Sequence, residues 1–175
     1  MSSSTLQAIW PGEKHENIRE FHNSYGTAPI VWGEFCKRYL KRESSWWLFH
    51  ASQPEGRELW DLFKDTRIPE SHRAVFAFTF DHFYVKREDY KRFSKDLRAF
   101  LDNTLISANH INHWPLIAQF FEMEPDYPAV ALWCTSVTSD PWNGEWDEAS
   151  EDYTPFNWSK AYDLYAELDA VDILA

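Results

Sequence analysis

Glycine is scarce in this chain of 175 residues, which contains only five. Loops that hold a phosphate group with backbone N–H groups are built from closely spaced glycines. The P-loop, the GxGxxG dinucleotide motif, the GxSxG nucleophile elbow and the HExxH zinc motif are all absent from the sequence. The sequence therefore disfavours cofactor chemistry and the common hydrolase mechanisms, and we expect neither a cofactor nor an enzyme activity.

Cysteine and long apolar runs are also scarce. Cys36 and Cys134 lie among apolar neighbours without a CxxC or Cys/His pattern, so we interpret both as small buried side chains. The N-terminal residues lack a basic segment followed by an apolar one, and apolar runs such as residues 74–78 are too short to cross a bilayer. We expect one soluble, cytoplasmic domain over residues 1–175, since a chain of this length can bury one core.

Basic residues are almost missing from the C-terminal part of the chain. Residues 139–175 contain ten acids and a single base, Lys160, whereas residues 1–138 contain 18 acids and 16 bases. Most of the formal net charge of −11 is therefore C-terminal. Negative potential repels nucleic acid and anionic membranes and speeds encounters with basic proteins. We expect a protein partner, and no direct contact with nucleic acid or membrane.

The spacing of apolar residues predicts helices in six segments: residues 13–23, 27–40, 54–65, 86–102, 112–122 and the stretch after Asn157. Thr27 and Asn157 are the predicted N-caps of the second and the last helix, and Pro115 suits a first helical turn.

Strands are predicted at residues 45–50, 73–80 and 129–138, with residues 83–85 as an extension of the second strand. In residues 73–80, Phe76, Phe78 and Phe80 alternate with smaller side chains, as in a central strand. Together these elements predict an α+β fold with helices packed around a small central sheet.

One segment, residues 139–153 (SDPWNGEWDEASEDY), combines carboxylates with aromatic rings and has no base. Clustered carboxylates are costly to bury, so we expect the segment to face water. The carboxylates would pair with Lys or Arg of a partner, and the rings would anchor the contact. The predicted partner-binding residues are Asp140, Trp142, Glu145, Trp146, Asp147, Glu148, Glu151, Asp152 and Tyr153.

Two other interpretations of this segment remain open. Trp142 and Trp146 could fold back over the sheet and leave the acids in an ordinary solvated loop. Oxygen ligands for Ca²⁺ could come from Asp140, Asn143, Glu145 and Asp147, although their spacing does not match the EF-hand loop.

Histidines in the middle of the chain define a further alternative, a small hydrolase. Asp81 and His82 end the predicted strand at residues 73–80, and His110 and His113 form an HxxH pattern at the start of a predicted helix. Such residues can bind a metal or transfer protons. An HxxH pattern without neighbouring carboxylates often arises by chance, so surface or capping roles are favoured, and we predict no metal site.

The predicted helix at residues 86–102 carries six basic residues, Lys86, Arg87, Lys91, Arg92, Lys95 and Arg98. A basic helix can indicate nucleic-acid binding. Four acids on the same helix dilute this charge, and Glu88 and Arg92 have the spacing of an i,i+4 ion pair. We interpret the helix as having an ordinary solvated face.

In overall character the chain resembles bacterial immunity proteins of polymorphic toxin and contact-dependent growth inhibition systems. The resemblance lies in the Phe-rich run RAVFAFTF (residues 73–80), the charged helix after it and the acid and Trp cluster DPWNGEWDEASEDY. It implies a toxin inhibitor that covers the active site, or a neighbouring surface, of a basic toxin, often a nuclease. The acids would then replace phosphates, and Trp142, Trp146 and Tyr153 would fill pockets. The charge pattern equally suits a phage- or plasmid-type nucleic-acid mimic that inhibits a host enzyme.

Overall fold

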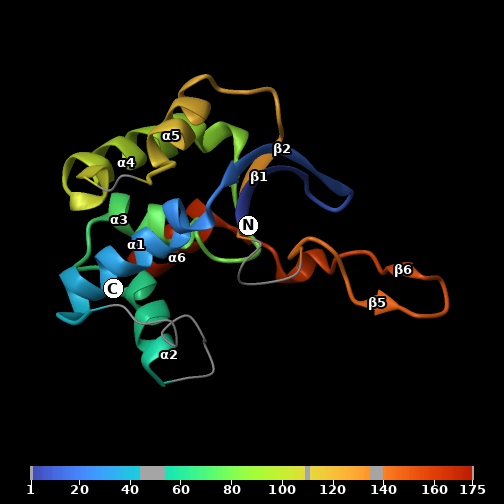
Figure 1. Ribbon diagram of the computed structural model, residues 1–175, viewed down its shortest axis with the longest axis horizontal. Coiled ribbons are helices and arrows are strands. Elements are labelled where there is room, and N and C mark those ends of the chain that lie inside the picture. The colour runs from blue at the N-terminus through green and yellow to red at the C-terminus, as the bar shows by residue number, and fades with distance from the viewer. Residues whose placement is uncertain (1, 44–53, 109–110, 135–139, 175) are drawn as a thin grey trace.

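The computed structural model describes residues 2–43, 54–108, 111–134 and 140–174. Within these residues, the largest sheet has five strands in the order β2-β1-β4-β3-β7 (Figure 1). The strands are β1 (Ser3–Trp10), β2 (Lys14–His22), β3 (Phe83–Lys86), β4 (Ala129–Cys134) and β7 (Tyr162–Asp163). β3 and β7 run parallel, and the other neighbouring pairs are antiparallel. The predicted α+β class is confirmed.

The helices gather on one side of this sheet, and some of them pack on other helices. They are α1 (Ala28–Phe35), α2 (Pro54–Asp61), α3 (Glu70–Ala77), α4 (Tyr90–Asp102), α5 (Trp114–Glu122) and α6 (Leu164–Ile173). Leu6, Val85 and Leu132 of the sheet join the helices in one apolar core, because alternate strand residues point to the same face. Within the described part of the chain, no helix is long and apolar enough to span a membrane.

The opposite face of the sheet has a smaller apolar cluster of its own. Ile9, Ala129 and Ala131 are fully buried there, although no helix core reaches them. Trp142, from the segment that follows β4, packs on these three residues. The C-terminal segment thus covers the face that the helices leave open.

The strand predicted at residues 73–80 is wrong, because these residues belong mostly to α3. Residues 72–79 are all buried, so this stretch has no exposed face that would mark a helical period in the sequence. Under those conditions, the alternation of Phe with smaller residues imitates a strand. Phe76 and Phe80 instead lie one helical turn apart, with ring centroids separated by 4.7 Å.

The helix predicted at residues 13–23 is also wrong, because this segment forms the edge strand β2. Its inward residues, Ile18 and Phe21, are three positions apart, which suggests a helix. The register shifts opposite Leu6 and Gln7, so that Ile18 is an extra residue in the ladder. This bulge brings Ile18 and Phe21 to the same face of a strand. The partner strand β1 was not predicted.

The remaining predictions are largely confirmed, with shorter elements. α2, α4, α5 and β4 lie within the predicted segments, and both cysteines are buried. Thr27 precedes α1, but its hydroxyl donates to the Ser24 carbonyl instead of capping the helix. Asn157 caps only a short 3-10 turn, whereas Asp163 caps α6. The predicted strand at residues 45–50 and the end of the one at 129–138 fall outside the described residues.

The buried His72 of α3 makes the stability of the fold depend on pH. Its side chain is 3% exposed, and its Nδ1 atom lies 2.6 Å from the Tyr39 hydroxyl oxygen. Burial, together with the charge of Arg38, lowers the pKa of His72 from 6.5 to about 4. The neutral ring is therefore the form that the core accepts.

We expect the free energy of unfolding to decrease as the pH falls from 6.5 to 4, because the unfolded chain takes up a proton at His72 and the folded chain does not. The His72 contribution should reach up to about 3 kcal/mol over this range. Chemical denaturation at several pH values measures it. In His72→Asn the pH slope should be shallower than in the wild type, and identical slopes would contradict this assignment.

Candidate protein-binding hairpin

Residues 144–154 form a hairpin, here called the acidic hairpin, that projects from the body of the molecule (Figure 1). Strands β5 (Trp146–Asp147) and β6 (Asp152–Tyr153) pair antiparallel. At its base, the Gly144 N–H donates to the Thr154 carbonyl and the Thr154 N–H donates to the Glu145 carbonyl, each at 2.9 Å. The segment predicted to face water is thus an ordered ribbon.

The turn of the hairpin is closed by one of its own carboxylates. Asp147 accepts hydrogen bonds from the Ala149 N–H at 3.1 Å and from the Ser150 hydroxyl at 2.8 Å. The bond from Ser150, followed by that from Ala149, lowers the pKa of Asp147. Asp147 therefore stays ionised while it shapes the turn.

The base of the hairpin requires a glycine at position 144. A Cβ atom there would lie 2.3 Å from the Thr154 hydroxyl oxygen and 2.4 Å from the Thr154 carbonyl oxygen. Real Cβ atoms do not approach other atoms so closely, so the two chains of the ribbon can meet here only at a glycine. This requirement explains one of the few glycines in the sequence.

Trp142 anchors the segment that leads into the hairpin. Its side chain is 2% exposed and packs on the cluster of Ile9, Ala129 and Ala131. The ring centroids of Phe156 and Trp158, which follow the hairpin, lie 5.2 and 5.4 Å from that of Trp142. The chain before the hairpin and the chain after it are therefore held together on the open face of the sheet.

Asp140 provides a polar anchor beside Trp142. Its carboxylate lies 3.0 Å from His15 Nε2, accepts from Gln7 Nε2 at 3.4 Å, and accepts from the Trp142 N–H at 3.0 Å. Burial acts to raise the pKa of Asp140, but the hydrogen bonds from His15 and the Trp142 backbone outweigh it and hold the pKa below its usual value. Asp140 thus ties the segment to β1 and β2.

His82 holds the same segment from the other side. It adopts a left-handed backbone conformation, with φ of 68°, and its Nε2 atom bonds with the Pro141 carbonyl. Its ring packs on Phe156 at 4.6 Å between centroids. A backbone conformation that is unfavourable for histidine is therefore used to position the base of the hairpin.

The two faces of the acidic hairpin differ in chemistry. Trp146 and Tyr153 are directly opposite each other on one face, 49% and 47% exposed, with ring centroids 5.2 Å apart. Asp147 and Asp152 are directly opposite each other on the other face. This face of the hairpin therefore carries two carboxylates, and one of them, Asp147, also closes the turn.

Most of the hairpin acids are fully open to solvent. The exposed residues are Glu145, Glu148, Glu151 and Asp152, and Asp147 is half-buried. Ion pairs link many acids and bases elsewhere in the described residues, but none of them includes these five acids. Lys160 borders a hollow together with Glu145 without forming such a pair. The negative charge of the hairpin is therefore not neutralised within the described chain.

In contrast, most basic residues of α4 and of the segment just before it are paired with acids. Arg87, Lys91 and Arg98 pair with acids outside α4, at the end of α5 and just after it. The predicted pair of Glu88 with Arg92 is wrong: Arg92 Nη2 lies 2.7 Å from Glu70 and 2.9 Å from Asp169 instead. The two-fold pairing of Arg92 leaves this helix without a strong basic surface.

The structure separates the residues on which the other interpretations depended. One alternative had both tryptophans folded back over the sheet. Trp142 does cover the sheet, whereas Trp146 is exposed on the hairpin. His113 Nε2 lies 2.9 Å from the His22 carbonyl oxygen, while His110 falls outside the described residues. Over the part of the chain that is described, no group of three or more His, Cys, Asp or Glu residues could hold a metal ion.

Several residues that shape the site were not among those predicted from the sequence. They are His15, His82, Gly144, Thr154, Phe156 and Trp158. The isolated glycine between two tryptophans is the one local signal that could have indicated a tight approach of two chains. The others act through partners that are distant in sequence.

Replacing Trp142 with Ala should decrease the free energy of unfolding by about 3 to 5 kcal/mol, because a buried ring leaves a cavity over the sheet. Trp146→Ala is the matched control, since that ring is half exposed and should change stability by no more than about 0.5 kcal/mol. Urea denaturation of both variants tests the assignment. Equal losses, or a larger loss for Trp146→Ala, would contradict it.

Gly144→Ala should open the base of the acidic hairpin, because the added methyl group collides with Thr154. Hydrogen exchange at the Thr154 amide should accelerate by about tenfold or more, since its bond to the Glu145 carbonyl is lost. The amides of β1 and β4 provide the internal control and should keep their protection. An unchanged exchange rate at Thr154 would show that the two chains do not meet as described.

Comparisons with known proteins do not assign this chain to a family. No protein-family model matches the chain, and neither does any curated protein or solved structure. The acidic hairpin is therefore interpreted from its own geometry.

Proposed function

We propose that this chain is a cytoplasmic bacterial immunity protein, which binds a cognate basic toxin of the nuclease type through the acidic hairpin and neutralises it. One observation carries the proposal. The hairpin places Asp147 opposite Asp152 and Trp146 opposite Tyr153, with no neutralising Lys or Arg among the described residues. An acidic face and an aromatic face on one exposed ribbon are the two elements that a cationic protein surface would contact.

The energetics of the hairpin support a binding role. The hairpin gathers five carboxylates that form no ion pair among the described residues, and a basic partner can supply the missing positive charge. Trp and Tyr are the side chains most often found at the centre of protein interfaces, because a large ring becomes buried at little cost in side-chain entropy. In the free protein both rings are about half exposed, so a partner gains contact area by covering them.

A nuclease suits this surface because enzymes that cleave nucleic acid present Lys and Arg to the phosphate backbone. The exposed carboxylates of Glu145, Glu148 and Glu151 would occupy the positions of phosphates in such a cleft. Long-range attraction would speed the encounter, and burial of Trp146 and Tyr153 would slow dissociation. A hairpin that projects from the body can enter a cleft more deeply than a flat surface can.

The proposal is tested by measuring binding to the protein encoded beside this gene, at several NaCl concentrations. A variant with Glu145→Gln, Glu148→Gln, Glu151→Gln and Asp152→Asn should raise the Kd roughly tenfold or more and flatten its dependence on salt. The fold should remain intact, because these four side chains are exposed.

The matched control changes four exposed acids outside the hairpin: Glu43, Asp61, Glu88 and Asp102. Both variants lower the net negative charge by the same amount, so only the position of the charge differs. The control should bind nearly as tightly as the wild type. Equal affinity of the hairpin variant and the wild type, or failure of the neighbouring gene product to bind, would count against the proposal. A gene setting of phage origin with a host enzyme as target would favour the nucleic-acid mimic.

A further inference from the structure

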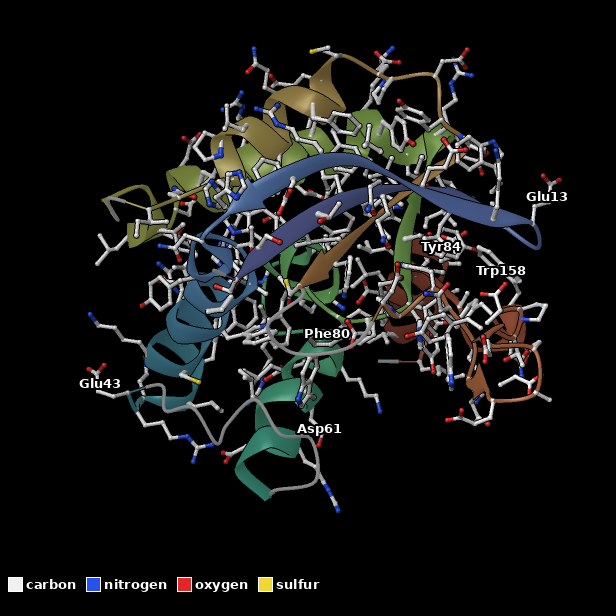
Figure 2. All side chains as sticks on the ribbon, turned by 45° about the vertical axis from the view of Figure 1, so that its right-hand side comes forward. Glu13, Glu43, Asp61, Phe80, Tyr84 and Trp158 are labelled. Atoms are coloured by element: carbon white, nitrogen blue, oxygen red, sulfur yellow. The ribbon has the colours of Figure 1, made fainter. Side chains whose placement is uncertain are left out.

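A hollow of about 390 Å³ lies between the β1–β2 turn and the base of the acidic hairpin. Glu13 and Lys14 of the turn line one side, and Tyr153, Phe156 and Trp158 line the other, with Trp142 between them. Glu13 and Trp158 lie on the same side of the molecule (Figure 2). The hollow is therefore next to the surface that the proposed partner would cover.

Aromatic rings form one wall of the hollow. The Phe156 and Trp158 centroids are 5.4 Å apart, and each packs on Trp142 at a similar distance. Trp142 is buried, whereas Phe156 and Trp158 are only partly covered, and both of them line the hollow. Their ring faces carry partial negative charge, which attracts a cation placed over them.

The basic side chains that line the hollow, Lys14 and His15, are already engaged by the protein itself. Lys14 Nζ lies 2.7 Å from Glu16 and 4.7 Å from the centroid of the Trp10 ring. His15 is held by Asp140 at 3.0 Å. Glu13 is the acid that lines the hollow, and it belongs to none of the ion pairs of the described residues, so its carboxylate can pair with a positively charged occupant beside the rings.

The chemistry of the wall favours arginine over lysine. A guanidinium group is planar and weakly hydrated, so it stacks on aromatic faces and can still pair with carboxylates at its edge. An ammonium group is compact and strongly hydrated, and it loses more solvation in an aromatic hollow. Charge alone would not distinguish the two, so selectivity for arginine reports on the rings.

We propose that this hollow receives an arginine side chain of the basic partner, which stacks on Phe156 and Trp158 while neighbouring partner cations pair with the acidic hairpin. The inference rests on the proposed function, because the same partner supplies the arginine. The hollow is a second contact point for the partner, at the base of the acidic hairpin. Its rings are held in place by their packing on Trp142.

Peptides of nine arginines and of nine lysines are the probes, and calorimetric titration at physiological salt gives their affinities. The wild type should bind the arginine peptide roughly three to thirty times more tightly than the lysine peptide. Trp158→Leu should remove this preference and change the lysine affinity by less than about twofold. The four-amide variant of the hairpin acids should weaken both peptides by a similar factor.

The outcomes separate this inference from the function on which it rests. If the wild type binds both peptides equally and Trp158→Leu changes neither affinity, the arginine site is overturned and the acidic hairpin stands. If the wild type binds neither peptide, the acidic surface itself fails as a contact for cations. Should Trp158→Leu unfold, Phe156→Leu replaces it with the same expectation, since that ring is the other half of the stacking wall.

Discussion

The burial of Trp142 on the open face of the sheet is the interaction on which the rest of the site depends. Ile9, Ala129 and Ala131 form an apolar patch that the helices do not reach, and Trp142 covers it. Asp140 and His82 hold the same segment with hydrogen bonds, and the Trp142 ring adds the apolar contact that fixes it on the sheet. One buried ring thus supports the core on one side and positions a charged ribbon on the other.

The distribution of charge follows a simple division. In the body of the molecule, bases such as Arg73 and Arg92 are paired with acids from distant segments, which ties the elements together. On the acidic hairpin, five carboxylates have no counter-ion from the described chain. Asp147 shapes the turn, but the exposed acids Glu145, Glu148, Glu151 and Asp152 form no ion pair that ties the elements of the body together. This distribution suits a surface for which another molecule supplies the missing cations.

The sequence predicted the fold class and the helices with one polar face, of which α4 is the clearest. It failed for α3, in which every residue from His72 onward is buried and no exposed face marks a helical period, and for β2, where a bulge at Ile18 imitates helical spacing. The composition indicated the acidic, aromatic segment, but its pairing into a hairpin was not predicted. Composition could not separate Trp142 from Trp146, because what decides between them is contact with β1 and β4, which no local pattern encodes.

Hydroxyl-radical footprinting of the free protein, read out residue by residue by mass spectrometry, tests the central claim most directly. We expect rapid oxidation of Trp146 and Tyr153 and slow oxidation of Trp142, because only the first two rings meet solvent. Equal rates for the two tryptophans, or protection of Trp146 in the isolated chain, would mean that the hairpin is not displayed and that its charges have some other purpose.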